Sequence, residues 1–190
     1  MALPVESNGG FSVTKVGLPR LGEVVRSGVE GTLQLNLGSF NDNVKREWDQ
    51  LREFDVLFLV TIDMSQAMTE AEAEANSGEE KIKVNDEDDL TFARRYGITA
   101  VRGCEIIDVR DDQGNEVNPP GNLPSKARGN RRSIRVSLDP AQYHFDEKSK
   151  RNRARGLKVY EEINLVVRRG AKENNFKSVL ETIRDLMKGE

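Results

Sequence analysis

The sequence predicts an α+β fold, mostly β: a small open barrel or folded antiparallel sheet with short helices and a C-terminal amphipathic helix. Several short segments alternate apolar and polar residues or are continuously apolar, as β-strands are. Segments with helical periodicity are few and short, and they do not alternate with strands as in βαβ proteins. At 190 residues, the chain is long enough for one domain with a proper core but hardly for two.

The first half of the chain is expected to hold three strands and one short helix. Strands are predicted at 13–16 and at 31–37, and in the second segment Leu33, Leu35 and Leu37 alternate with polar residues. Asn41 or Asp42 can cap a helix that runs to about residue 52. The continuously apolar run at 56–62 predicts a central strand covered on both faces.

The second half is expected to hold three more strands, a hairpin turn and two helical turns. Residues 111–115 read DDQGN, which is typical of a hairpin turn, and Asp139-Pro140 reads as the cap and first residue of a short helical turn that runs through Tyr143. A further helical turn is expected at 91–96. The remaining strands are predicted at 98–109, 133–138 and 162–168.

We expect a flexible N-terminus at 1–10 and a single β-rich domain at 11–188. That domain carries two segments of biased charge. Residues 63–90 hold ten acidic side chains against two lysines and are predicted to be a disordered acidic insertion. Residues 148–158 form a basic loop. The larger segment 126–169 holds thirteen Lys and Arg against five acidic residues, so the sequence separates charge strongly along the chain.

The segment 172–187 predicts an amphipathic helix. Its apolar residues form one continuous stripe, and Asn174 is a plausible N-cap. Because such a stripe must pack on another surface, we expect the chain to be a piece of a longer protein. The stripe consists of Phe176, Val179, Leu180, Ile183, Leu186 and Met187.

Catalytic chemistry is not indicated by any residue pattern. The chain has no match to the phosphate-binding pattern G-x-x-x-x-G-K-[ST], so no ATP or magnesium site is expected. Cys104 and His144 are the only cysteine and histidine, which is too few for a metal site and excludes an internal disulfide. Cys104 is expected to be a small buried strand residue. The longest apolar run is too short to span a bilayer, so no membrane partner is expected.

Two basic clusters are candidates for RNA contact through the phosphate backbone. Neither cluster contains aromatic side chains that could stack on bases. Nuclear import explains the second cluster, KSKRNRAR, equally well. The candidate RNA-binding residues are Lys126, Arg128, Arg131, Arg132, Lys150, Arg151, Arg153 and Arg155.

Five blocks of the sequence, in this order, resemble the aquarius family of intron-binding spliceosomal RNA helicases. They are VGLPRLGEV (16–24), REWDQLREFDVLFLVTI (46–62), VRGCEIIDVRDDQGN (101–115), RSIRVSLDPAQYHFD (132–146) and VYEEINLVVRRGAKENNF (159–176). The resemblance covers the strand-rich accessory region upstream of the helicase core. ATP and magnesium would belong to that core, which is not contained in this chain.

The resemblance implies a non-catalytic accessory domain that acts in pre-mRNA splicing. It implies contacts with spliceosomal proteins and with pre-mRNA intron RNA, and a location in the nucleus. The basic clusters support a different hypothesis, in which the chain is a stand-alone, sequence-independent RNA-binding module.

Overall fold

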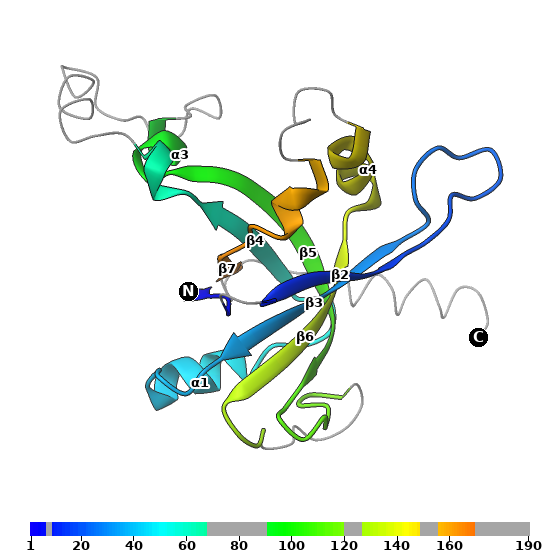
Figure 1. The fold of residues 1–190 in the computed structure, drawn as a ribbon. Coiled ribbons are helices and arrows are strands. Elements are labelled where there is room, and N and C mark those ends of the chain that lie inside the picture. Colours follow the sequence, from blue (N-terminus) through cyan, green and yellow to red (C-terminus); the bar gives the residue numbers. More distant parts are fainter. Residues whose placement is uncertain (7–8, 68–90, 120–126, 149–155, 170–190) are drawn as a thin grey trace.

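The computed structural model describes residues 1–6, 9–67, 91–119, 127–148 and 156–169. These residues form one seven-stranded antiparallel sheet in the order β1-β7-β4-β5-β6-β3-β2, with short helices at its ends (Figure 1). The predicted fold class is thereby confirmed. The elements are β1 (Ala2–Pro4), β2 (Phe11–Val16), β3 (Val29–Asn36), α1 (Asp42–Trp48), β4 (Val56–Ile62), η1 (Met64–Gln66), α3 (Thr91–Arg95), β5 (Ile98–Arg110), β6 (Arg131–Leu138), α4 (Pro140–Lys148), η2 (Gly156–Tyr160) and β7 (Leu165–Arg168).

The long strand β5 joins the two halves of the sheet. Its residues 98–105 pair with β4, whereas only its residues 104–110 pair with β6. Register shifts between Thr61 and Ile62 and between Ile106 and Asp108 bend the strands, as β-bulges do. The sheet therefore folds over its own core without closing into a continuous barrel.

The N-terminal segment is a strand and not the flexible tail expected at 1–10. Leu3 is 2% exposed and pairs with Val166 of β7, and the amide of Val5 donates to the carbonyl of Asn164 at 3.0 Å. Further along, the Gly10 carbonyl accepts from the amide of Gln34 in β3. Strands β1 and β2, which follow each other in the chain, thus lie at opposite edges of the sheet. The segment is too short for its alternation to be recognised in the sequence.

The core lies on the concave face of the sheet. In β3 the odd-numbered residues are buried and Glu30, Thr32 and Gln34 are only partly exposed, which confirms the predicted alternation. Gly31 belongs to the buried set because the ring of Phe11 lies over it, so that a Cβ atom there would be 2.6 Å from the ring. The largest fully buried side chains are Trp48, Leu33, Leu35, Leu37, Leu51, Leu57, Leu59, Ile106 and Ile134.

The outer face of β2, β3, β6 and β5 carries ion pairs that cross the strands. Lys15 pairs with Glu30 at 2.6 Å, and Arg135 lies between Glu30 at 3.9 Å and Asp108 at 2.6 Å. Opposite charges on neighbouring strands stabilise a sheet modestly and keep this face compatible with water. On the other half, Phe58 of β4 is 37% exposed, so the expectation that this strand is covered on both faces is only partly met.

The ends of two helices and the start of one strand differ from the predictions. The Asn41 side chain accepts from the Val44 amide at 3.0 Å and caps α1, as expected, but the helix ends at Trp48 and not near residue 52. The Asp139 side chain accepts from the Ala141 amide at 2.8 Å at the start of α4, which continues to Lys148 and is longer than predicted. Strand β7 begins at Leu165, three residues after the predicted start at 162.

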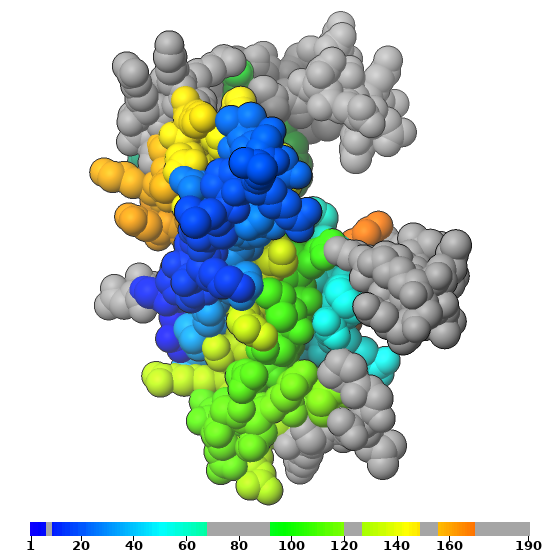
Figure 2. Space-filling view, turned by 90° about the vertical axis from the view of Figure 1, so that its right-hand side faces the viewer, coloured from blue at the N-terminus to red at the C-terminus, as the bar shows by residue number. Residues whose placement is uncertain are grey.

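The loop between β2 and β3 projects from the sheet and lies beside α4. Figure 2 shows this loop in blue next to the yellow helix, and Arg26 of the loop pairs with Glu147 of α4 at 2.7 Å. At the tip of the loop, Leu21 and Val24 are exposed.

Several predictions lie wholly or largely outside the described residues: most of the acidic insertion 63–90, most of the basic loop 148–158, and the amphipathic helix 172–187. The C-terminal limit of the domain at 188 stays a prediction. No helix in the described ranges is long and apolar enough to cross a membrane.

Candidate functional site

A buried carboxylate links three elements at one end of the sheet. Asp146 of α4 is 0% exposed and accepts two hydrogen bonds from the guanidinium of Arg102 in β5, at 2.8 and 2.7 Å. The Tyr160 hydroxyl of η2 donates to it at 3.0 Å and the Gln142 amide at 3.2 Å. Every described partner is a donor, as a buried carboxylate requires. The network fixes α4 and η2 against β5.

The electrostatics of this network follow from burial and charge. Burial alone would lower the pKa of Arg102, but the hydrogen bonds and the charge of Asp146 outweigh it and raise this pKa. Burial, followed by the charge of Asp146, raises the pKa of Tyr160. The tyrosine is therefore a neutral donor and the arginine a cation at physiological pH, which makes this a structural ion pair and no source of protons.

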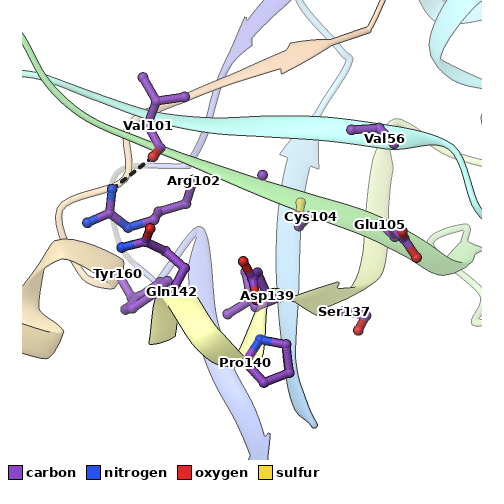
Figure 3. Close-up of a pocket in the computed structure, with 12 residues that line it drawn as sticks. Val56, Val101, Arg102, Cys104, Glu105, Ser137, Asp139, Pro140, Gln142 and Tyr160 are labelled. Atoms are coloured by element: carbon purple, nitrogen blue, oxygen red, sulfur yellow. Dashed lines mark hydrogen bonds between the residues drawn. The ribbon is translucent and has the colours of Figure 1, made fainter. Parts of the chain in front are cut away.

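A cavity of about 540 Å³ opens between β5 and the start of α4. Figure 3 shows Arg102 and Cys104 on the β5 side, with Asp139, Pro140 and Gln142 opposite and Tyr160 at one end. The lining combines apolar and polar groups, and Asp139 at its rim is exposed. Concave sites of this size and composition bind small molecules or single side chains.

Cys104 lines this cavity, but its buried thiol is a poor nucleophile. It is 4% exposed, its thiol lies 3.6 Å from the Leu57 carbonyl, and burial raises its pKa to about 12. A thiol with such a pKa is almost fully protonated at neutral pH and is a poor nucleophile. The expectation of a small buried strand residue is confirmed.

We expect Cys104 to resist thiol reagents in the folded protein. Since it is the only cysteine, the yield of released thionitrobenzoate with Ellman's reagent at pH 8 measures this residue alone. Less than about a tenth of the thiol should react under native conditions in the time that denatured protein reacts fully. Raising the pH from 7 to 9 increases the thiolate fraction about a hundredfold, but with a pKa of about 12 this fraction is still only about one in a thousand at pH 9, so the native reaction should stay slow. Rapid stoichiometric reaction at pH 8 would contradict the raised pKa.

The structure also places the single histidine, Gly103 and the residues that could act as metal ligands. His144 lies on α4 with its Nδ1 atom 4.0 Å from Glu147, and it does not line the cavity. Gly103 lies in the regularly paired part of β5, and a Cβ atom there would meet nothing within 4 Å, so neither a bulge nor a close backbone approach requires a glycine at this position. Within the described ranges, no group of three His, Cys, Asp or Glu side chains could hold a metal ion.

The candidate RNA-binding arginines that the structure describes lie at the start of β6 or just before it, at the opposite end of the sheet from the Asp146 network. The side chain of Arg131 is 69% exposed, and Arg128 is exposed with its guanidinium 3.0 Å from Gln113. Arg132 is 3% exposed and pairs with Asp49 at 2.7 Å, so its charge is used inside the fold. The remaining candidates, Lys126, Lys150, Arg151, Arg153 and Arg155, lie outside the described residues.

Sequence reasoning could have recognised the buried position of Arg132. Strand β6 begins at Arg131, two residues before the predicted start, and its even-numbered residues all point inward. Extending the alternation of Ile134 and Val136 by one step assigns Arg132 to the core. The Arg102–Asp146 pair had no comparable signal, because its partners are 44 residues apart and meet only after folding.

Taken together, these observations define an open, folded antiparallel β domain, with a cavity at one end and two exposed arginines at the other. Comparison with known proteins places the chain more narrowly. Residues 1–169 match the family model described as intron-binding protein aquarius, beta-barrel, so the chain belongs to the aquarius family.

A relative in the mouse, Mus musculus, is named RNA helicase aquarius. It is 35% identical over 189 residues, which cover 98% of this chain and 11% of the mouse protein. The chain thus spans about a tenth of its relative's length and corresponds to a β-barrel domain of an RNA helicase. The sequence-based recognition of this family is confirmed.

Proposed function

We propose that this domain is a non-catalytic accessory part of an aquarius-like spliceosomal RNA helicase and acts in pre-mRNA splicing in the nucleus. It contributes through contacts with spliceosomal proteins and with intron RNA. The observation that carries the proposal is the family match over residues 1–169, in a family described as intron-binding. The described residues supply binding surfaces and a structural ion-pair network, which suits a part that holds other components in place.

The proposal is tested on the native protein. An epitope tag at the natural locus allows its size to be measured and its bound RNA to be sequenced after crosslinking. We expect a product several times longer than 190 residues that contains a phosphate-binding loop, and enrichment of intron over exon sequence in the bound RNA. A native product of this length without intron enrichment would overturn the proposal and leave a stand-alone module.

Exposed basic side chains favour a second function, sequence-independent RNA binding. Arg128 and Arg131 lie near one end of the sheet with exposed side chains. Cationic side chains that contact phosphates release counterions, so affinity falls as salt rises, with a slope of about −0.7 per contact on single strands. Because binding of this kind reads the phosphate backbone and not the bases, it would be insensitive to sequence.

We expect the double variant Arg128→Gln/Arg131→Gln to weaken RNA binding and to flatten its salt dependence. With a labelled 20-nucleotide oligouridine and fluorescence anisotropy, the slope of log affinity against log salt should fall in magnitude by about 1.4, which is two contacts at about 0.7 each. The matched control is Arg94→Gln/Arg95→Gln, which removes the same charge from α3 at the opposite end (Figure 1). Equal effects of the two variants would show that only net charge matters.

A further inference from the structure

The first half of β5 has one open edge. Residues 98–103 pair only with β4, because β6 joins β5 from Cys104 onward. Strand β6 ends at Leu138, and the chain turns away there into α4. No other strand in the described part of the chain lies along this edge. Open strand edges of this kind are places where a further strand can pair.

Val101 directs its backbone polar groups toward the open edge. In antiparallel pairs, neighbouring residues alternate between facing the partner strand and facing away. The Val60 carbonyl of β4 accepts from the amide of Asn164 on the β7 side. The backbone N–H and C=O groups of Val60 and of its partner Val101 therefore point away from each other. The Val101 carbonyl accepts from the guanidinium of Arg102 at 2.8 Å and not from a strand. Val101 is 47% exposed, and among the described residues its amide donates to no backbone carbonyl.

The cavity lies along the same edge, between β5 and the start of α4 (Figure 3). A strand added beside Val101 would place alternate side chains on the cavity side of the sheet, because side chains alternate along a strand. On that side Cys104, Leu138 and Tyr160 offer an apolar floor. At a volume of about 540 Å³, the space is large enough for one or two side chains.

Charge around the cavity favours a cationic ligand. The charge of Arg102 is matched by that of Asp146, so this pair leaves no net charge. Asp139 at the rim is exposed and negative. A lysine or arginine of a bound chain could therefore pair with Asp139, and an RNA phosphate would be repelled there.

We propose that the open edge of β5 binds an extended peptide of a partner protein by strand addition. One apolar side chain of the peptide enters the cavity between β5 and α4, and a basic side chain lies near Asp139. Backbone hydrogen bonds to Val101 supply affinity and the cavity supplies selectivity, as in other proteins that recognise peptides at a sheet edge. This peptide binding is independent of the proposed role of the domain in splicing.

Selection from a phage-displayed library of random nine-residue peptides tests the proposal with the 190-residue chain as bait. Selected peptides are then measured by fluorescence anisotropy against three variants. Val101→Pro removes the amide that faces the open edge without removing a hydrogen bond to β4. Val101→Ala keeps that amide and is the matched control. Asp139→Asn removes the rim charge but keeps a side chain able to cap α4.

We expect peptides with a basic residue and an apolar residue in alternating register. Val101→Pro should weaken their binding about tenfold or more, which corresponds to roughly 1.4 kcal/mol. Val101→Ala should stay within about twofold, and Asp139→Asn should reduce both the affinity and its salt dependence. A circular-dichroism melt checks that the proline variant folds. If the proline variant does not fold, the proposal is tested by hydrogen exchange of the Val101 amide in the natural chain. Bound peptide should slow the exchange of this amide.

Several results would overturn the proposal. Failure to enrich any peptide would do so, as would peptides that bind the natural chain and a folded Val101→Pro variant equally. If the Val101 amide is already protected in the free chain at every protein concentration, another part of the same chain occupies the edge. Protection that grows with protein concentration would mean that a second copy occupies it.

Discussion

Replacing Asp146 by alanine is expected to lower the free energy of unfolding by about 3–5 kcal/mol. The carboxylate is fully buried, and the guanidinium that it neutralises has only 14% of its side-chain surface exposed. Without Asp146, Arg102 keeps a charge that is poorly solvated, and the Tyr160 hydroxyl loses its acceptor. Since domains of this kind are stable by only about 5–15 kcal/mol, the loss is a large fraction of the total.

Urea unfolding followed by the fluorescence of Trp48, the single tryptophan, measures this change. The matched control is Glu147→Ala, one position further along α4, which removes a carboxylate whose ion pair with Arg26 is about one-quarter exposed on each side. Partly exposed pairs of this kind contribute about 0–1 kcal/mol. Equal losses in the two variants would show that the Asp146 network is not a main support of this end of the sheet.

The pattern of the sequence determines the strands well and the side-chain network poorly. The apolar run at 56–62 becomes β4 with the predicted bounds, since a continuous run of β-forming residues between polar segments has few alternatives. Alternation likewise identifies β3 and most of β6. The apolar run and the alternation both involve residues that are close in the sequence, so they identify a strand without knowledge of its partner strands.

What the sequence does not reveal depends on contacts between distant segments. Strand β1 has three residues and is held by β7, which lies about 160 positions later in the chain. The Arg102–Asp146 pair and the open edge of β5 arise because β6 ends where α4 begins. Charge patterning groups Arg128, Arg131 and Arg132 together, yet the structure buries only Arg132. A cluster of like charges in the sequence therefore does not by itself predict a charged patch on the surface of the folded protein.

Replacing Trp48 by alanine is the second change with a large expected effect, at about 3–5 kcal/mol of unfolding free energy. Trp48 is 1% exposed and ends α1, the helix that covers one end of the core. The backbone around it is held by side chains from distant elements: Arg168 donates to the Glu47 carbonyl, and Asn118 donates to the Asp49 and Leu51 carbonyls. Because these contacts hold the backbone in place, the cavity left by the ring cannot collapse.

Trp48→Phe separates the volume of this side chain from its polarity. The indole N–H of Trp48 is buried without a hydrogen-bond partner in the described part of the structure. Phenylalanine leaves a smaller void and removes that unpaired donor, whose burial costs about 1–3 kcal/mol, so the net loss should stay below about 1.5 kcal/mol.

Circular dichroism must replace fluorescence as the probe for both Trp48 variants, because each removes the only tryptophan. Phe145→Ala is the matched control: it truncates an aromatic residue that is 61% exposed on α4 and should change stability by less than about 0.5 kcal/mol. If Trp48→Phe proves as costly as Trp48→Ala, the indole N–H has a partner that compensates it. In that case α1 would be held in place by a polar contact as well as by packing.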